Sequence, residues 1–587
     1  MAGVFGGGRA WARTGKGALL YQSPGLIESS SHCGKFAIVQ GDSHGIKSNP
    51  APCHAIPAPR AYTSISAGTF IVTNIAEMLR IRALATPDTI GLCYLEQRFT
   101  WREFYLQAHS LSLELAGVGI GRGDVVAVYL PHSVGQAVAL FAVAMRGAVF
   151  TLINPMLVAE QIKHQVSDAD ARAIIGAPNL TRPLAEFFHS ENITVVPADP
   201  AGIPESGWDP DCDLEQTLSA AIPADVCNYI YTSGSTGLPK GVVVPQRTVL
   251  DGARIVSGYL RITPDDHILS ILPFSFDYGL NQLMSCVYTG ARITLHQFIF
   301  PKDLVDLVEN EGITGMAVVP PVWAKLLKPG IRKDHSFRRL RYVTSGGGFH
   351  PPELLRRVTE FLPDTEIIVM YGLTESFRST YLPFDQIHHR PGCVGRAVPE
   401  VEILVLDERG EPCAPGEKGE LVHRGAFVTY GYLNNPQLTA EKFIPLNVGG
   451  RDCLPETAVR SGDRVSMDED GYIYYHGRID QQIKSSGYRI SPDEVAEAVL
   501  ATPGVALAAA FGLPDEELGE AVHVAYETDS GEPVDSVDIV RHAKASLAAY
   551  AIPKHFHFYD KLPLNPNGKV DFGALKRAAR DAGTGAN

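Results

Sequence analysis

The chain has 587 residues, of which 45% are hydrophobic and 20% are charged, as is typical of a globular protein with more than one domain. Its net charge of −14 excludes a general electrostatic attraction to nucleic acid or to an anionic membrane surface. The nine cysteines include no Cys-x-x-Cys pair, which argues against a zinc site or a disulfide framework and predicts a reducing, cytoplasmic location.

The beginning of the chain differs from the rest in composition and periodicity. Residues 1–71 are rich in glycine, serine and proline and show little periodicity, so we expect a poorly ordered extension there. The globular part then begins at Val72. The longest apolar stretch, residues 134–153, contains Gln136 and Arg146, which favours a buried helix and strand over a membrane span.

Helical and strand patterns alternate from Val72 onwards, which predicts parallel α/β layers. Thr100 begins one of these helices, because Glu103 follows three residues later as in a capping box. The first set of expected elements comprises a helix at 74–85, a strand at 90–94, the helix from Thr100, a strand at 124–130 and a helix at 135–146. The second set comprises a helix at 249–260, a strand at 268–272, a helix from Asn281 and a strand at 291–295.

A glycine-rich stretch separates these two sets. Residues 231–241 read Tyr-Thr-Ser-Gly-Ser-Thr-Gly-Leu-Pro-Lys-Gly and lie between strand patterns at 226–231 and 241–245. Glycines let backbone N–H groups close on an anion, and the hydroxyls and Lys240 add donors, so the stretch predicts a phosphate cradle. Its spacing is not that of the Walker motif. A flexible linker is the alternative, which the flanking strand patterns disfavour.

Three expected strands end in residues that are unusual for a scaffold. Residues 273–279 place Asp277 among aromatic side chains, the strand at 340–348 runs into three glycines, and residues 369–375 end in Thr374 and Glu375. Because ligands collect at the carboxyl ends of strands in open α/β sheets, we expect these three ends to share one crevice.

The pattern changes beyond Pro399. Short strands at 402–406, 419–423 and 472–475 predict a strand-rich subdomain. A helix with an N-cap at Ser491 and compact strand–helix alternation follow, so we place a domain boundary near Asp480. This divides the globular part into residues 72–479 and 480–587. Near its end, Lys569 lies in a loop rich in proline, asparagine and glycine, which cannot be core.

Five motifs in a fixed order resemble the adenylate-forming superfamily of acyl-CoA synthetases, peptide-synthetase adenylation domains and luciferases. They are the loop at 231–241, Tyr371-Gly-Leu-Thr-Glu375, Ser461-Gly-Asp463, Gly477-Arg-Ile-Asp480 with Lys484 and Gly487, and Asn567-Gly-Lys569. The resemblance covers about residues 72–578. It implies an α/β fold, with a large N-terminal domain of two parallel-type α/β sheet subdomains plus a β-rich subdomain, and a small mobile α+β C-terminal domain that carries the catalytic lysine.

The resemblance also implies the reaction. A carboxylate attacks the α-phosphorus of ATP to give an acyl adenylate and pyrophosphate, and a thiol then displaces AMP. Lys569 would contact the carboxylate and the α-phosphate, Thr374 would lie near the α-phosphate, and Glu375 would ligate Mg²⁺, since attack of one anion on another needs cations and donors. The β- and γ-phosphates would lie in the loop formed by Thr232, Ser233, Gly234, Ser235, Thr236, Gly237 and Lys240.

The same resemblance implies contacts to the nucleoside. Asp463 would accept hydrogen bonds from both ribose hydroxyls, with help from Arg478. Gly346 and Gly347 would lie along adenine, and Tyr371 would stack on it. The alternatives are a surface ion pair for Asp463 and Arg478 and a helix cap for Thr374.

The small domain would rotate between the two half-reactions, about a hinge at Asp480. Lys569 would then leave the site, while Lys484 and Gly487 would turn inward to line the thiol tunnel.

The acid is predicted from two charged positions. Where many acyl- and aryl-CoA ligases carry a histidine, this chain has Phe276, and Asp277 follows as in amino-acid adenylation domains, where an aspartate pairs with the substrate ammonium. A carboxylate among aromatic side chains needs a cation, which an arginine of the protein could supply instead. The acid pocket is expected to be lined by Asp277, Tyr278, Asn281, Val318, Val343, Ser345, Met370, Arg378 and Ser379.

Arg378 and Ser345 together predict a carboxylate clamp, because a planar guanidinium suits bidentate pairing. The substrate would then be an amino-dicarboxylate such as aspartate, 3-methylaspartate or glutamate, as in stand-alone enzymes that load a β-amino-acid starter onto a carrier protein for polyketide assembly. The competing hypothesis is that Arg378 and Asp277 neutralise each other in a pocket for an ordinary acyl chain. Exosortase-associated acyl-CoA ligases resemble the chain at residues 276–279 (Phe-Asp-Tyr-Gly) and 377–379 (Phe-Arg-Ser).

The acceptor is expected to be a separate molecule, either a carrier protein or coenzyme A, because no carrier domain follows Lys569. An acyl-CoA ligase for a non-amino acid and a non-catalytic sensor of nucleotide or acyl adenylate are the alternative functions.

Overall fold

The computed structural model describes residues 72–204, 207–208, 212, 221–232, 239–328, 330–331, 337–348, 350–446, 455–479, 482–485, 488–515, 518–547, 549–566 and 568–584. All elements below belong to the compact unit formed by residues 65–587. The extension predicted for residues 1–71 lies outside the described residues. No helix in the described part is long and apolar enough to cross a membrane.

The first α/β layer is a six-stranded sheet with the order β6-β5-β3-β4-β7-β8. Five of its strands are parallel, and β8 closes the edge as an antiparallel partner of β7. Its strands are β3 (Val125–Tyr129), β4 (Val149–Leu152), β5 (Ala171–Gly176), β6 (Thr194–Pro197), β7 (Val226–Thr232) and β8 (Lys240–Pro245). Its helices are α3 (Val134–Met145), α4 (Ala159–Asp168), α5 (Pro178–Thr181) and α6 (Ala185–Ser190). The predicted alternation is confirmed, and the apolar stretch at 134–153 is a buried helix followed by a strand.

The second α/β layer belongs to a 14-stranded sheet with the order β16-β17-β19-β20-β15-β14-β13-β12-β11-β9-β10-β1-β2, to which β18 adds beside β19. Strands β1 and β9 to β13 pair in parallel. These elements are β1 (Ile90–Tyr94), β2 (Gln97–Thr100), β9 (His267–Ser270), β10 (Arg292–Leu295), β11 (Gly315–Val318), β12 (Tyr342–Ser345), β13 (Glu366–Tyr371), α8 (Asp277–Thr289), α9 (Pro301–Asn310), α10 (Pro320–Leu326) and α11 (Pro352–Phe361). Helix α8 begins four residues earlier than predicted, so Asp277 lies in its first turn, where the helix dipole favours a negative charge.

The strand-rich subdomain continues this same sheet through antiparallel pairs. Its elements are β14 (Thr380–Leu382), β15 (Cys393–Ala397), β16 (Val401–Leu406), β17 (Lys418–Gly425), β18 (Phe443–Leu446), β19 (Glu456–Met467), β20 (Ile473–Arg478) and α12 (Pro436–Lys442). One hydrogen-bonded ladder therefore connects the second α/β layer to the strand-rich part.

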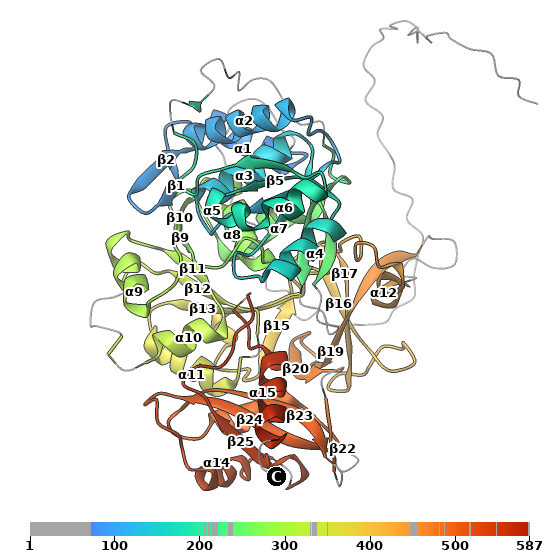
Figure 1. Cartoon of the computed structure of the whole chain (residues 1–587). Coiled ribbons are helices and arrows are strands. Elements are labelled where there is room, and N and C mark those ends of the chain that lie inside the picture. The colour runs from blue at the N-terminus through green and yellow to red at the C-terminus, as the bar shows by residue number, and fades with distance from the viewer. Residues whose placement is uncertain are drawn as a thin grey trace, which may run out of the picture. The chain divides into compact units, whose positions relative to one another are not determined.

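Helices join the two α/β layers into one core (Figure 1). Helices α1 (Ile75–Ala85) and α2 (Trp101–Gly117) pack against α3, and α1 also packs against α7 (Gln246–Leu260) and α8. The predicted capping box forms, since Thr100 Oγ1 accepts from Glu103 N at 3.2 Å and Glu103 Oε2 accepts from Thr100 N at 2.7 Å. Gly91 has to be glycine, because a Cβ there would lie 2.3 Å from the fully buried Trp101 indole.

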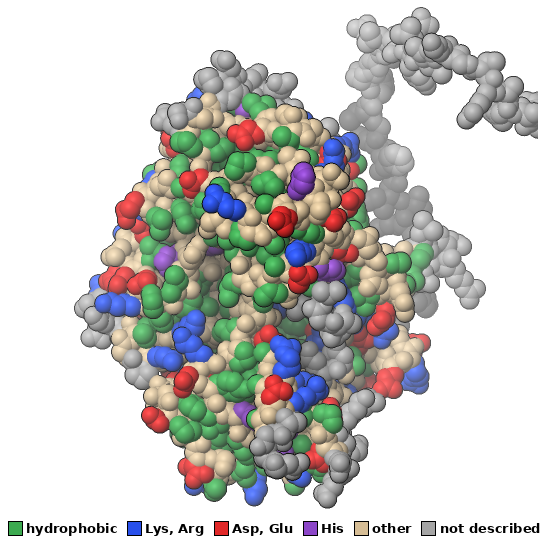
Figure 2. Space-filling view, viewed as in Figure 1, with side chains coloured by type: hydrophobic (Ala, Val, Ile, Leu, Met, Phe, Trp, Pro, Cys, Tyr) green, Lys and Arg blue, Asp and Glu red, His purple; other side chains and the backbone are tan. Residues whose placement is uncertain are grey.

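The C-terminal part contains a long antiparallel hairpin, β23 (Val505–Asp515) with β24 (Gly519–Thr528). Its other elements are β21 (Ile483–Ser485), β22 (Tyr488–Ile490), β25 (His555–Phe558), α13 (Pro492–Leu500), α14 (Ser536–Ala543) and α15 (Phe572–Thr584). Pro492 and two acids occupy the first turn of α13 as predicted, but the Ser491 side chain makes no capping hydrogen bond. On the face shown in Figure 2, acidic and basic side chains are interspersed and form no continuous basic stripe.

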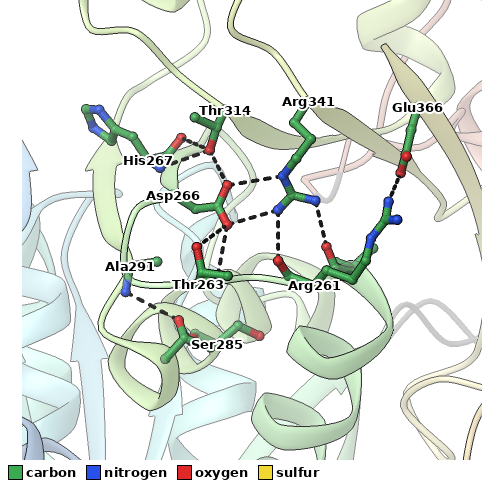
Figure 3. Close-up of polar contacts among 11 residues, drawn as sticks. Arg261, Thr263, Asp266, His267, Ser285, Ala291, Thr314, Arg341 and Glu366 are labelled. Atoms are coloured by element: carbon green, nitrogen blue, oxygen red, sulfur yellow. Dashed lines mark hydrogen bonds and ion pairs between the residues drawn. The ribbon is translucent and has the colours of Figure 1, made fainter. Parts of the chain in front are cut away.

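A buried carboxylate ties together the amino ends of the second layer's strands (Figure 3). Asp266 accepts from Thr263 N at 2.8 Å, from Thr314 Oγ1 at 2.7 Å and from Arg341 Nη2 at 2.9 Å. Only 6% of its side chain is exposed, whereas Arg341 retains 32%. These bonds fix the entry to β9, β11 and β12, and they lie at the opposite end of the strands from their carboxyl termini.

Asp266→Ala is expected to destabilise the fold by about 3 kcal/mol, at the low end for a broken buried ion pair because Arg341 is partly solvated. Thermal unfolding followed by circular dichroism measures the effect. Glu360→Ala is the matched control, because it breaks an exposed Arg356–Glu360 pair and should change stability by less than about 0.5 kcal/mol. Equal midpoints for the two variants would contradict the structural role of Asp266.

Candidate active site

The three predicted strand ends do meet at one edge of the 14-stranded sheet. Strands β9, β12 and β13 are parallel and separated only by β11, so the residues that follow them emerge side by side. Tyr278 Oη donates to Thr344 Oγ1 at 2.6 Å, which links the aromatic stretch after β9 to β12. A Cβ at Gly346 would lie 3.1 Å from the Met370 carbonyl and 3.3 Å from the Tyr278 ring. Gly346 therefore lets β12 pack closely against the Met370 carbonyl and the Tyr278 ring.

Lys569 reaches this crevice from the C-terminal part. Its Nζ lies 5.2 Å from the centroid of the Phe276 ring. Displacement of water by the surrounding protein lowers the pKa of Lys569, and the carboxylates of Asp277, Glu375 and Asp463 oppose that shift. Part of the Lys569 side chain nonetheless remains exposed to solvent.

The loop that carries Lys569 is held in a tight turn. Lys569 N donates to Asn565 Oδ1 at 3.0 Å, and Asn565 N donates to the Lys569 carbonyl at 2.7 Å. Asn154 in the first layer donates to the Pro566 carbonyl at 2.6 Å, which connects the loop to the N-terminal domain. Local sequence gave no signal for this contact, because it joins residues 412 positions apart.

Asp463 and Arg478 face each other across neighbouring strands. They are register partners in β19 and β20, and Arg478 Nη1 lies 3.2 Å from Asp463 Oδ1. Tyr371 Oη also donates to Asp463. Burial and the neighbouring Asp463 charge raise the pKa of Tyr371, so its hydroxyl remains a donor. The ion pair that was the alternative for these residues does form, but Asp463 is buried at the crevice and not at the surface.

Glu375 follows β13 in a turn, so Thr374 caps no helix and that alternative is wrong. Thr429 N and Oγ1 donate to the Glu375 carbonyl at 3.1 and 2.9 Å, which fixes the turn. Tyr432 Oη donates to the Glu375 carboxylate, a partner that the sequence alone did not reveal.

The Glu375 carboxylate is a donor of the kind that Mg²⁺ binds. A metal site built only from protein side chains is not present, because the described residues contain no group of three or more His, Cys, Asp or Glu side chains that could hold a metal ion. Mg²⁺ often binds through one carboxylate with waters and substrate phosphates, so Glu375 fits such an ion as its single protein ligand. Bound there, the ion would neutralise phosphate charge.

The glycine loop connects β7 and β8, whose ends pair Thr232 with Lys240. The residues at both ends of the loop are therefore held in one antiparallel ladder. Thr232 also lines a cavity with Asn154, Ser275, Asn565 and Pro566, which places the beginning of the loop beside the turn that precedes Lys569. Ser233, Gly234, Ser235, Thr236 and Gly237 lie outside the described residues.

The hinge and tunnel prediction stays untested. Asp480 and Gly487 also lie outside the described residues, and of Lys484 only the backbone, in β21, is described.

The predicted acid pocket contains two buried, oppositely charged side chains. Asp277 is 4% exposed and Arg378 is 3% exposed. Burial raises the pKa of Asp277, and the nearby Arg378 and Lys569 charges oppose that shift. Arg378 Cζ lies 4.8 Å from the Tyr278 ring centroid, while its Nε and Nη2 atoms are buried and have no hydrogen-bond partner in the described part of the chain. Among the described residues no carboxylate forms an ion pair with Arg378, so Asp277 does not neutralise it directly.

The remaining predicted pocket residues are buried beside these two. Asn281 Nδ2 is buried and has no hydrogen-bond partner within the described ranges. The Ser379 hydroxyl lies 3.0 Å from His423 Nδ1, and the Ser345 hydroxyl is bonded to Trp323 and His350. Ser345 therefore has no spare donor for a carboxylate, which leaves Arg378 alone in the predicted clamp. Val318, Val343 and Met370 complete the buried set.

The AMP-binding enzyme family matches residues 79–433, and the AMP-binding enzyme C-terminal domain matches residues 494–569. The probable CoA ligase CCL9 of Humulus lupulus is 31% identical over 476 residues, which cover 79% of this chain and 88% of that protein. Tyrocidine synthase 3 of Brevibacillus parabrevis is 31% identical over 510 residues, which cover 85% of this chain but only 8% of that much longer synthase.

Solved structures agree with the fold. The o-succinylbenzoate CoA synthetase of Bacillus subtilis, in complex with its acyl-adenylate intermediate, is 26% identical with a TM-score of 0.74 over 86% of this chain and 98% of that one. The same synthetase has also been solved in complex with ATP and a magnesium ion. The chain belongs to the AMP-binding enzyme family and is an AMP-forming adenylating ligase.

Proposed function

We propose that this enzyme adenylates an amino acid with a second carboxylate, such as aspartate, 3-methylaspartate or glutamate, and passes the acyl group to the thiol of a carrier protein. The observation that carries the proposal is the buried Arg378 guanidinium, which lacks an ion-pair partner among the described residues. An unpaired buried ion costs on the order of several kcal/mol, a cost that a ligand carboxylate would remove. Such strained charges concentrate at functional sites.

Asp277 and Arg378 would each bind a different group of the substrate. Asp277 would accept hydrogen bonds from the substrate ammonium, and Arg378 would hold the distal carboxylate. The carboxylate to be activated would then lie towards Lys569, whose ammonium is within electrostatic reach of Asp277. Fixing three groups of one small molecule orients the attacking oxygen, which lowers the entropic part of the barrier.

The nucleotide would occupy the same crevice. Asp463 and Arg478 would bind the ribose, Tyr371 would stack on adenine, and Gly346 and Gly347 would lie along its edge. Thr374 would lie near the α-phosphate. The loop from Thr232 to Lys240 would hold the β- and γ-phosphates.

In the first step the substrate oxygen forms a bond to the α-phosphorus, and the bond to the bridging oxygen breaks as pyrophosphate leaves. Lys569 would stabilise the charge that develops on both reactants. In the second step the thiol sulfur attacks the acyl carbon and AMP leaves with the electron pair. Lys484 and Gly487 would line the approach of the thiol after the small domain rotates about Asp480.

The second candidate is an AMP-forming CoA ligase for a non-amino acid. The similarity to a full-length plant CoA ligase favours it. In that case coenzyme A would be the acceptor. A non-catalytic nucleotide sensor is disfavoured because Lys569, Glu375 and Asp463 act on one another in a single crevice.

Pyrophosphate exchange with matched acids tests the proposal. Aspartate should support exchange about 10⁴-fold better than asparagine, which lacks the second carboxylate, or succinate, which lacks the ammonium, because each leaves a buried charge of the site unpaired. Strong exchange with fatty or aryl acids and none with amino acids would overturn the substrate assignment but not the adenylation chemistry.

A further inference from the structure

A buried histidine spans both ends of the glycine run that follows β12. His350 Nε2 lies 2.6 Å from Ser345 Oγ, and the ring also hydrogen-bonds to the backbone of Gly348. Ser345 is completely buried and His350 is 6% exposed. Ser345 and Gly348 flank Gly346 and Gly347, so one imidazole ring is bonded to the residues on either side of these two glycines.

The directions of these hydrogen bonds follow from the partners. Trp323 Nε1 can only donate, and it lies 2.8 Å from Ser345 Oγ, so the serine oxygen accepts there. The serine proton is then free to be donated to His350 Nε2, and the other ring nitrogen carries the proton given to the Gly348 carbonyl. Burial lowers the pKa of His350 to about 4, so the ring is neutral near pH 7 as this network requires.

The glycine run needs such support. Gly346 and Gly347 carry no side chains that could pack and fix them, and Gly347 adopts a φ of +75°. Glycine loses more conformational entropy on ordering than other residues. A ligand that lies along a loose run would have to order it, which weakens binding, whereas a run held beforehand is already shaped for the ligand.

We propose that His350 is a positioning residue that holds Gly346 and Gly347 in the shape that receives adenine. It acts through the backbone of the run and through Ser345, and it does not contact the nucleotide. This inference rests on the proposed function, because that function puts adenine at Gly346 and Gly347.

Calorimetric titration of the whole protein with ATP, without any acid, tests the inference. His350→Leu removes both hydrogen bonds and is expected to raise the Kd for ATP about 10-fold through lost preorganisation. In His350→Asn the side-chain amide places an N–H donor near the position of the imidazole Nδ1. This donor can still bond to Gly348, so the variant should weaken ATP binding by a smaller factor. A larger loss of ATP affinity in His350→Leu than in His350→Asn would follow the number of hydrogen bonds removed. A change in side-chain volume alone would not produce this order.

His267 supplies a matched control. It is also 6% exposed, its Nδ1 lies 3.0 Å from the Glu311 carbonyl, and its Nε2 lies 2.7 Å from Thr294 Oγ1. It begins β9, at the amino end of the strands, so it is remote from the crevice. His267→Leu loses the same kinds of bonds and should lower the unfolding temperature similarly while leaving the Kd for ATP unchanged.

Three results would overturn the inference. They are an unchanged Kd in both His350 variants, an equal rise in the Kd for His350→Leu and His267→Leu, and an increase only in the KM for the acid during pyrophosphate exchange. If the unmodified protein failed to bind ATP, the proposed function would itself be wrong, and this inference with it. If it binds ATP but exchanges no amino-dicarboxylate, only the substrate assignment fails.

Discussion

Lys569→Ala is expected to slow acid-dependent pyrophosphate exchange by about 10³-fold, because adenylation joins two anions and Lys569 is the cation that reaches the crevice from the C-terminal part. Its ammonium lies near Phe276 and interacts with the carboxylates of Asp277, Glu375 and Asp463. Thioester formation from a preformed acyl adenylate should be nearly unaffected, since the proposed rotation of the small domain would take Lys569 out of the site for that step. Comparing the two half-reactions in one protein separates a catalytic defect from a folding defect.

Lys561→Ala is the control for this variant. Lys561 is an exposed lysine eight positions earlier in the same domain, and we assign it no role in the crevice. Its loss should leave exchange within about twofold of the unmodified enzyme, as is usual for an exposed side chain without a partner in catalysis. Lys569→Ala with normal exchange would remove the main argument against a non-catalytic nucleotide sensor.

Arg378→Leu is expected to lower kcat/KM for an amino-dicarboxylate by about 10³-fold, because the distal carboxylate would enter a buried site without its cation. The kcat/KM for an amino acid with an apolar side chain should stay unchanged. The ratio of kcat/KM for the amino-dicarboxylate to kcat/KM for the apolar amino acid therefore measures specificity. The substitution should also raise the unfolding temperature of the ligand-free enzyme, since it removes a buried charge that has no ion-pair partner among the residues described. Lost specificity together with gained stability would be the signature of a charge kept for a ligand.

Arg341→Leu is the structural counterpart. Arg341 also lies 4.8 Å from a tyrosine ring centroid, that of Tyr342, but it is paired with Asp266. Its loss should lower the unfolding temperature and leave the substrate preference unchanged. If Arg378→Leu behaved like Arg341→Leu, or if Asp277→Ala left the preference for amino acids intact, the amino-dicarboxylate pocket would be ruled out.

Much of the fold and the chemistry follows from local sequence. The alternation of periodicities predicts the α/β layers, the Thr100–Glu103 capping box forms as expected, and the strands before Asp277, Gly346 and Thr374 end at one edge. These features depend on residues close together in the chain, where propensity and spacing act directly. The five motifs likewise resemble those of the adenylate-forming superfamily, and the match to the AMP-binding enzyme family confirms that resemblance.

The tertiary structure alone decided the contacts between distant segments. Strand β1 joins β10 of the second sheet, although in the sequence it lies within the first set of elements, and the strand-rich part continues that same sheet. Tyr432 reaches Glu375, and Trp323 and His350 occupy the Ser345 hydroxyl that the sequence assigned to a substrate carboxylate. Sequence could place Arg378 and Asp277 in one pocket but not show whether they pair. That depends on how α8 packs against the segment between β13 and β14. This packing brings the two charges within electrostatic reach and leaves Nε and Nη2 of Arg378 without a hydrogen-bond partner among the described residues.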